Sequence, residues 1–356
     1  MRKSPAFTVV TRARPHDRRR MIDKVVMHGI SELLAIEQAW WLLWERCSRR
    51  TPFQSPGWLL PWYRAFRPGE PFAFAFWDAG RLVGIAPFYA KHETDGFHLQ
   101  PFGTAVSDFL DMLVEPGWED LVAEALAVAL AAEPGWTTIT FDELPSDATA
   151  LRLKTLRACT VSEQIASTCP VLTLECRVPV ESNLPSHLQR NLRKARRRAA
   201  RRGEVHFILA DEGAAQCTFD RLVDLHTARW RARDQAGVLA DERIQRFHAD
   251  VIKVLYPKAV ARLYELRIAG QTAAAYYGFQ DHNRAYAYIS GFDPRFAHES
   301  PGSLLLAHVI ADSASTGAQE FHFLRGSETY KYAWGAHDRR NHRRQFVRIA
   351  SLADVI

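Results

Sequence analysis

The chain has 356 residues and a formal net charge of +6, with 46 Lys and Arg against 40 Asp and Glu. Its hydrophobic share of 47% and charged share of 24% are ordinary for globular proteins and exclude a largely disordered chain. Five cysteines without CxxC spacing predict neither a disulfide framework nor a zinc site. No apolar run reaches the ~18 residues of a membrane span, and no signal-peptide pattern is present, so we expect a cytoplasmic protein.

The first 25 residues are rich in arginine and offer little that could form a core. They predict a disordered basic tail. The sequence is also compatible with a start at Met21 or Met27.

Beyond the tail, the two halves of the chain predict the same order of elements. The first half predicts helices at 36–50 and 57–66, a hairpin at 72–90, an extended segment at 108–114, a helix at 118–132 and a strand at 137–141. The second half predicts helices at 214–233 and 241–255, a hairpin at 262–280, an extended segment at 284–290, a helix at 302–316 and a strand at 319–324. We interpret this as two fused copies of one α/β unit, with chance recurrence of a common pattern as the alternative.

The two copies differ at the start of the helix that follows the hairpin. In the first copy, VEPGWEDL places Glu115, Glu119 and Asp120 there, and these carboxylates would repel a phosphate. In the second copy, HESPGSLLL leaves Gly302 and Ser303 without an acidic neighbour on their C-terminal side. Open N–H groups at such a helix start can receive a pyrophosphate, so we expect the phosphorylated ligand in the second half.

Between the halves lies the basic run SHLQRNLRKARRRAARRG, from Ser186 to Gly203, with eight Lys and Arg and no acid. An S-x-x-Q capping box, a stop at Gly203 and an apolar stripe predict a docked helix with a basic outer face. The stripe consists of Leu188, Leu192, Ala195 and Ala199. Arg193 and Arg197 are candidates to attract CoA phosphates, an anionic glycan or acidic lipid, and a plain solvated face is the alternative. No motif of a nucleic-acid-binding domain accompanies the run.

Four segments in this order resemble the CelD-type acyltransferases of the GNAT superfamily, which are relatives of the Fem-type aminoacyltransferases. They are LQRNLRKARRR, HTARWRARDQAGVLAD, ISGFDPRFAHESPGSLLLAHVI and FLRGSETYKYAW. The resemblance is strong over 170–347 and loose over 36–144. It implies an α/β fold of two fused GNAT-like lobes, each a mixed sheet flanked by helices. We therefore divide the chain into a tail (1–25), an N-terminal lobe (26–165) and a C-terminal acyltransferase lobe (166–356).

The resemblance also suggests where an acyl-CoA would bind. The usual cofactor loop of the superfamily survives only as Ser300 to Ser303, and His322 stands where the family tends to have an acid. The residues expected to hold acetyl-CoA or another acyl-CoA are Ser290, Gly291, Ser300, Gly302, Ser303 and Leu304.

Candidate catalytic residues follow FLRG. Tyr330 and Lys331 match an aromatic–lysine pair that is functionally important in Fem-type relatives, so Lys331 could hold a carbonyl oxygen or a charged acceptor. Glu328 is the candidate proton acceptor. The alternatives are packing for Tyr330, a surface position for Lys331 and helix capping for Glu328.

A possible substrate wall lies on the helix expected at 214–233. His226, Arg229 and Trp230 recur there at spacings of three and four, which brings His226 onto one face with each of the others. A buried, hydrogen-bonded histidine with a structural role explains the same pattern.

These observations predict an acyl-CoA-dependent N-acyltransferase that acts on an amine, or a hydroxyl, of a sugar, glycan or small molecule. Some family members are linked to exopolysaccharide or cellulose production. One alternative is an aminoacyl-tRNA-dependent transferase, in which the basic helix would contact tRNA. Another is a non-catalytic protein that binds nucleic acid or a polymer. No HExxH or similar spacing is present, so no metal is expected. No GxSxG, P-loop or GxGxxG motif supports a triad hydrolase, a P-loop NTPase or a Rossmann oxidoreductase. The sequence does not determine the acceptor or the oligomeric state.

Overall fold

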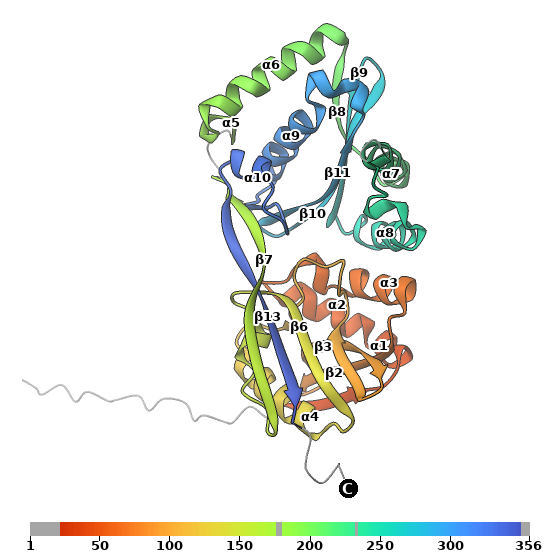
Figure 1. Ribbon diagram of the computed structural model, residues 1–356, viewed down its shortest axis with the longest axis vertical. Helices are drawn as coiled ribbons and strands as arrows, with labels where there is room; N and C mark the ends of the chain where they lie inside the picture. Colours follow the sequence, from red (N-terminus) through yellow and green to blue (C-terminus); the bar gives the residue numbers. More distant parts are fainter. Residues whose placement is uncertain (1–21, 176–179, 232–233, 350–356) are drawn as a thin grey trace, which may run out of the picture.

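The computed structural model describes residues 22–175, 180–231 and 234–349. These residues form two α/β lobes, one above the other, with two long strands running between them (Figure 1). The strands are β1 (Asp23–Met27), β2 (Glu70–Asp78), β3 (Arg81–Glu93), β4 (Gly96–Pro101), β5 (Leu113–Val114), β6 (Trp136–Pro145), β7 (Cys159–Thr173), β8 (Val205–Leu209), β9 (Ala261–Ile268), β10 (Gln271–Asp281), β11 (Arg284–Phe292), β12 (Glu320–His322) and β13 (His337–Arg348).

The helices divide between the lobes. Those of the N-terminal lobe are α1 (Ile30–Ala35), α2 (Glu37–Arg46), α3 (Pro56–Phe66) and α4 (Glu119–Ala132), with short 3₁₀ turns η1 (Pro52–Gln54) and η2 (Thr149–Arg152). Those of the C-terminal lobe are α5 (Val180–Asn183), α6 (Ser186–Arg202), α7 (Ala215–Arg231), α8 (Glu242–Leu255), α9 (Pro301–Ser315) and α10 (Thr329–Ala333), with 3₁₀ turns η3 (Val238–Ala240) and η4 (Pro294–Glu299).

One mixed sheet runs through both lobes. In the described part of the chain its strand order is β1-β2-β3-β4-β6-β13-β7-β12-β11-β10-β9-β8, with β5 attached to β3. The last strand, β13, returns to the N-terminal lobe, where it lies between β6 and β7. The end of β7 pairs with β12 of the C-terminal lobe. The predicted division at 165/166 therefore lies within a continuous strand, and the domain limits remain a prediction.

Both predicted hairpins form, and they turn in the same way. Ala79 and Gly80 have φ of 46° and 79°, and Ala269 and Gly270 have φ of 50° and 75°. Two successive residues with positive φ are typical of the tight turns that match the twist of paired strands. In each case glycine takes the second position, where the strain of positive φ is absent. The repeat seen in the sequence is thus present in the backbone.

Three apolar clusters hold the layers together. One fills the N-terminal lobe between its sheet and α4, and one fills the C-terminal lobe between its sheet, α6 and α9. The third joins the lobes: the rings of Trp58 (α3) and Phe247 (α8) meet at 4.8 Å between centroids, and Phe53 meets Phe279 at 5.9 Å. Because this core is shared, the lobes pack as one body.

The predicted helices are confirmed by α2, α3, α4, α7, α8 and α9. Of the extended segment expected at 108–114, only Leu113–Val114 is a strand, β5. The predicted tail lies mostly outside the described residues, but its end is wrong because β1 begins at Asp23 and pairs with β2. The strands β4, β7, β8 and β13 were not predicted.

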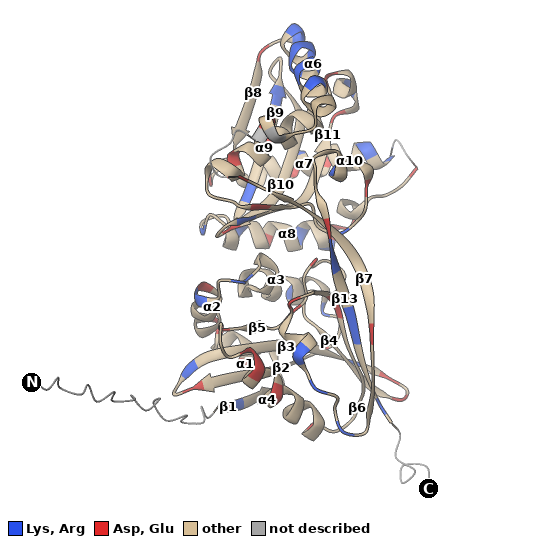
Figure 2. Cartoon of the chain, turned by 90° about the vertical axis from the view of Figure 1, so that its left-hand side faces the viewer, with Lys and Arg blue, Asp and Glu red and all other residues tan. Residues whose placement is uncertain are grey.

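The basic run forms α6, whose buried residues are the predicted Leu188, Leu192, Ala195 and Ala199. Its predicted capping box is wrong. Pro185 is the N-cap residue, and the side-chain amide of Gln189 instead donates to the carbonyl of Leu184 at 2.9 Å. In Figure 2, Lys and Arg gather along α6 at the far end of the C-terminal lobe. Among the described helices, none is long and apolar enough to cross a bilayer.

Candidate functional site

The C-terminal lobe contains a pair of parallel strands that separate. β11 and β12 pair only at Arg284–Glu320, Ala285–Phe321 and Tyr286–His322. Beyond this point Leu324 takes a φ of 59° and the chain turns away, while β11 continues to Phe292 against β10 alone. One edge of residues 287–292 therefore has no strand partner among the described residues. Free backbone groups on such an edge are available to a ligand.

The helix α9 begins close to the far end of this edge. Its N-cap, Ser300, has φ 51° and ψ 52°, makes no side-chain capping bond, and is followed by no acid in the first turn. The carbonyl of Ser300 accepts the N–H groups of Ser303 and Leu304 at 3.1 and 3.2 Å. The N–H of Gly302 has no acceptor among the described residues, while the Leu304 side chain is buried in the core. Gly302 is thus the open donor of this helix start.

The equivalent helix in the N-terminal lobe is different. α4 carries Glu119 and Asp120 in its first turn, and the Glu119 carboxylate accepts the N–H of Gly117 at 2.8 Å. Its start is therefore already occupied by negative charge, which disfavours a bound anion.

The predicted substrate wall on α7 lies beside β11. A Cβ built on Gly291 would come within 3.1 Å of the backbone nitrogen of His226, so the strand and the helix touch there. The Arg229 guanidinium lies 5.2 Å from the centre of the Phe292 ring, and a Cβ on Gly302 would lie 3.6 Å from that ring. The structure therefore brings these residues of α7, β11 and α9 into one region.

His226 is buried and neutral. Its Nε2 accepts the indole N–H of Trp230 at 2.8 Å, and its Nδ1 has no partner among the described residues. Burial, together with the positive charge of Arg229, lowers the pKa of His226 to about 4. At neutral pH the ring is therefore uncharged.

Lys331 organises the loop after β12. Its side chain is 3% exposed, and its ammonium group donates to the carbonyls of Leu324, Arg325 and Gly326 at 3.2, 2.7 and 3.1 Å. It also pairs with the carboxylate of Glu328 at 2.9 Å. An ammonium has three N–H donors, and the loop supplies an acceptor for each of them.

The other two predicted catalytic residues flank this lysine. Glu328 has a side chain that is 57% exposed. Partial burial raises its pKa, but the hydrogen bond from Lys331, a backbone hydrogen bond and the charge of Lys331 together outweigh this and leave the pKa below its usual value, which makes the carboxylate a weaker base. The ring of Tyr330 is half-exposed and meets Phe323 edge to face at 6.4 Å.

Among the described residues, Arg193 and Arg197 form no hydrogen bond or ion pair with this region. Both lie on the solvent side of α6, opposite its buried stripe. Two other arginines of α6 contact the segment before α9: Arg198 donates to the carbonyl of His298 at 3.1 Å, and Arg202 pairs with Glu299 at 3.1 Å. Sequence reasoning missed these two because all eight cations of the run look alike.

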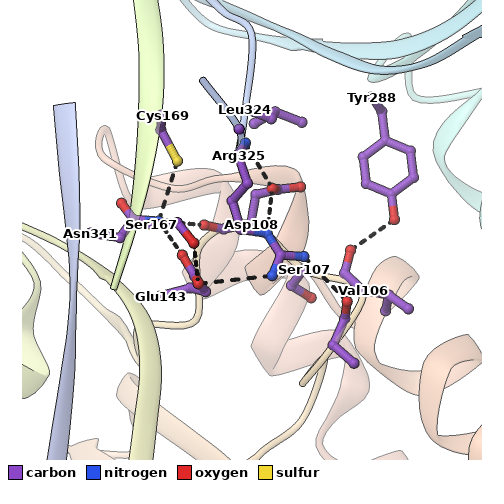
Figure 3. Close-up of polar contacts among 12 residues, drawn as sticks. Val106, Ser107, Asp108, Glu143, Ser167, Cys169, Tyr288, Leu324, Arg325 and Asn341 are labelled. Carbon is purple, nitrogen blue, oxygen red and sulfur yellow. Dashed lines mark hydrogen bonds and ion pairs between the residues drawn. The ribbon is translucent and has the colours of Figure 1, made fainter. Parts of the chain in front are cut away.

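A polar network joins the lobes beside the end of β12 (Figure 3). Arg325 donates to the buried carboxylate of Asp108 at 2.8 Å, and its guanidinium lies 3.9 Å from Glu143. Asn341 of β13 donates to Glu143 at 2.9 Å and to the carbonyl of Asp108 at 2.9 Å. Arg325 and Asp108 lie about 200 positions apart in the sequence, as do Asn341 and Glu143. No local motif could therefore predict these contacts.

A cavity of about 270 Å³ lies between the lobes next to this network. Its wall on the C-terminal lobe includes Tyr286 and His322, the last paired residues before β11 and β12 separate. Its wall on the N-terminal lobe includes Asp111, whose carboxylate accepts the N–H groups of Thr149 and Ala150 at 2.6 and 2.9 Å. Sequence reasoning noted His322 only as a departure from the family pattern.

Comparison with known proteins identifies the fold. Residues 186–332 match the family model described as an acetyltransferase (GNAT) domain. The structure resembles the crystal structure of FemX, with a TM-score of 0.64 at 11% identity, over 93% of this chain and 99% of that one. It also resembles a conserved protein of unknown function from Bacteroides thetaiotaomicron, with a TM-score of 0.56 at 11% identity, over 88% of this chain and 97% of that one. No curated protein sequence matches the chain.

The family match covers less than half of the chain and supports a GNAT-type acyltransferase domain in the C-terminal lobe. At 11% identity the structural similarities establish the fold alone, which is two GNAT-like α/β lobes. The predicted fold class is confirmed, with the correction that a single continuous sheet joins the lobes. No group of three or more side chains suited to a metal ion occurs among the described residues.

Proposed function

We propose that this protein transfers an acyl group from acetyl-CoA or another acyl-CoA to an amine or hydroxyl of a sugar, glycan or other small molecule. The observation that carries the proposal is the separation of β11 and β12, inside the part of the chain that matches the GNAT domain. The separation leaves a free strand edge that leads to a helix start without acidic residues.

The residues present fit an acyl-CoA. Its pyrophosphate would lie at Gly302 and Ser303, where an open N–H and the positive end of α9 favour an anion. Its arm would follow the free edge of β11 past Gly291 and Ser290. That edge spans roughly 20 Å from Tyr286 to Phe292, at about 3.3 Å per residue. When bound, the acyl-CoA supplies the activated thioester.

Each candidate residue then has a defined task. Backbone N–H groups of β11 would orient the thioester carbonyl and stabilise negative charge on its oxygen. His226, Arg229 and Trp230 would form the wall beside the arm. Lys331 would hold the loop after β12 in place, and Tyr330 and Glu328 would border its opening.

A second candidate function is transfer from an aminoacyl-tRNA. The solvent-facing cations of α6 favour it, because Arg193 and Arg197 form no ion pair among the described residues. Such a surface suits the backbone phosphates of a nucleic acid. The resemblance to CelD-type proteins suggests a further context, the synthesis of exopolysaccharide or cellulose, which belongs to the first candidate.

The direct test is isothermal titration calorimetry of the protein with CoA, acetyl-CoA and bulk tRNA. We expect saturable binding of CoA with a stoichiometry of one, and weak, salt-sensitive binding of tRNA. Absence of CoA binding together with tight tRNA binding at physiological salt would overturn the first candidate in favour of the second.

A further inference from the structure

We propose that the cavity between the lobes receives the acyl acceptor and that His322 is the base that removes the proton from its nucleophilic nitrogen or oxygen. The inference rests on the proposed function and assigns the second substrate of the same reaction.

His322 has one nitrogen bonded to the protein and one buried nitrogen without a partner among the described residues. Its Nε2 lies 3.0 Å from the Glu320 carboxylate. An ionised carboxylate can only accept, so Nε2 carries the hydrogen and Nδ1 carries a free lone pair. The side chain is 6% exposed and lines the cavity, and Nδ1 has no partner among the described residues.

Tyr286 faces the same cavity. It is fully buried, its ring lies 5.0 Å from that of His322, and its hydroxyl has no hydrogen-bond partner in the described part of the chain. Buried polar groups in native proteins almost always have partners, because leaving them unpaired is costly. The two groups lie next to each other in the wall of one cavity, and a ligand that accepts from the hydroxyl and donates to Nδ1 would satisfy both.

The position along the sheet fits this assignment. Tyr286 and His322 are opposite each other in the last pair before β11 and β12 separate. Under the proposed function, the free edge that begins at this pair carries the arm of the donor. The reacting acyl group at the end of that arm would therefore meet an acceptor in the cavity beside His322.

The charges around the cavity favour an acceptor with an anionic group. Arg284 donates to the carbonyl of Arg50 at 2.8 Å and has no carboxylate partner among the described residues, and the exposed Arg340 has none either. The carboxylates of Asp111 and Glu119 in the wall already accept backbone N–H groups. The remaining arginines in the wall, Arg49, Arg50 and Arg339, form ion pairs. Arg284 and Arg340 are thus the cations of the wall that have no carboxylate partner among the described residues, and an anionic group on the acceptor would pair with them.

The chemical step balances with these residues alone. The acceptor nitrogen or oxygen uses a lone pair to form a bond to the thioester carbon, and its proton passes to Nδ1 of His322. The carbonyl then re-forms as the carbon–sulfur bond breaks, and the thiolate takes the proton from Nδ1. Glu320 stabilises the transient imidazolium through its bond to Nε2–H and is a positioning residue.

The groups that surround His322 set its protonation. Burial lowers its pKa, and this outweighs the Glu320 carboxylate on the same strand, while Arg339 of β13 and Arg284 of β11 lower it further. The ring is therefore neutral at pH 7 and ready to accept a proton. With a lowered pKa, kcat/KM should stay constant as pH falls from 7 until it approaches that pKa, and only then decline.

The test compares the unaltered protein with two separate variants, His322→Gln and Tyr286→Phe. It measures transfer of the acyl group from acyl-CoA to an acceptor. The acceptors are glucosamine, glucosamine 6-phosphate and a mixture of the common amino acids, so that phosphate and carboxylate acceptors are distinguished. We expect H322Q to lower kcat by on the order of 10²–10⁴, the usual contribution of a general base, with CoA affinity unchanged. Y286F should mainly raise KM for the acceptor, and E320Q should shift the acid limb of the pH profile.

The matched control is His206→Gln. His206 of β8 also follows a glutamate by two residues, and its Nε2 lies 3.3 Å from Glu204, which directly precedes the strand, but the ring of His206 is exposed. This variant should keep full activity. Circular dichroism and CoA calorimetry check that each variant is folded. If H322Q does not fold, the Y286F variant decides: an unchanged KM for the acceptor overturns the assignment of the cavity to the acceptor.

Two outcomes separate this inference from the proposed function. If the unaltered protein binds no CoA, the proposed function fails and this inference fails with it. If the unaltered protein transfers acyl groups and H322Q does so at the same rate, the proposed function stands and this inference alone is overturned. Equal turnover of glucosamine and its 6-phosphate, with no turnover of amino acids, would contradict the anionic acceptor.

Discussion

At the scale of single residues, two roles can be distinguished for the buried ammonium of Lys331: donor to an oxyanion, or structural support of the loop after β12. As an oxyanion donor it would need a free N–H, whereas three loop carbonyls and Glu328 already surround it. The contacts favour a lysine that fixes the turn after β12. Burying a cation is costly unless every donor is satisfied, which explains why the loop wraps so closely around it.

We predict that Lys331→Met lowers the free energy of unfolding by about 2–4 kcal/mol, because several buried carbonyls lose a charged donor. Urea denaturation followed by circular dichroism measures this. Lys253→Met on α8, where the ammonium is exposed and pairs with Asp250, should change stability by less than about 0.5 kcal/mol. A Lys331→Met protein of unchanged stability that has lost turnover would instead support direct participation in the reaction.

The buried imidazole of His226 makes stability depend on pH. Its folded pKa is about 4, below the ordinary value, so the unfolded chain binds a proton more readily. The stability that the neutral ring contributes is present above the unfolded pKa of about 6.5 and is lost as pH falls toward 4. We predict that His226→Gln reduces the slope of unfolding free energy against pH between 6 and 4.5, by up to ~1.4 kcal/mol per pH unit.

Guanidinium denaturation at several pH values measures this slope. His248 is also buried, and its pKa is lowered to about 3 by burial, so it contributes a similar slope that the His226→Gln variant retains. An unchanged slope in the variant would show that the His226 ring is not held neutral by its surroundings.

At the scale of elements, the contrast between α9 and α4 is the basis for locating the phosphates. Gly302 lies in the first turn of α9, where an added side chain has room, since a Cβ there would make only ordinary contact with Phe292 at 3.6 Å. A glutamate at that position also agrees with the helix dipole, so the fold should tolerate it. The same charge would oppose a pyrophosphate.

We predict that Gly302→Glu weakens CoA binding by at least about tenfold, or roughly 1.4 kcal/mol, through like-charge repulsion. Glu119→Gln at the start of α4 is the matched control and should leave CoA affinity unchanged. Calorimetry measures both. Equal CoA affinity in the Gly302→Glu variant and the unaltered protein would exclude the start of α9 as the phosphate site.

The elements that sequence could predict share a local cause. The apolar stripe of α6 and the Ala–Gly turns of both hairpins are each encoded within a few residues. β13 could not be predicted, because HDRRNHRRQFVR is largely charged and becomes a strand only by pairing with β6 and β7. The capping box failed because Pro185 already occupies the cap position of α6.

The residues of the candidate site likewise divide into those that local sequence predicts and those that only the tertiary fold brings together. The positions of Gly302 and His226 follow from spacing along one helix or turn. The contact of Arg325 with Asp108, and the approach of Tyr286 to His322, depend on the tertiary fold alone. A lysine in a motif does not reveal whether its donors are free, which is why the surroundings of Lys331 needed the structure.

At the scale of the whole molecule, the continuous sheet and the shared core link the two lobes. β13 follows the C-terminal lobe in sequence but completes the N-terminal sheet, and Trp58 of α3 packs on Phe247 of α8. The Arg325–Asp108 pair adds a polar link across the same boundary. Domains joined in this way should unfold together, although the sequence suggests a division near residue 165.

We predict that Phe346→Ala destabilises both lobes equally. Phe346 is fully buried on β13, where it meets Phe141 of β6 at 6.5 Å between ring centres, so its loss should cost about 3–5 kcal/mol. Hydrogen exchange, read by mass spectrometry, should show the slowest amides of β3 in one lobe and β10 in the other losing the same protection. Val347→Ala, at an exposed neighbouring position, is the control and should change little. If β3 loses protection while β10 keeps it, the lobes are independent folding units, and the division at 165/166 is a true domain boundary despite the shared sheet.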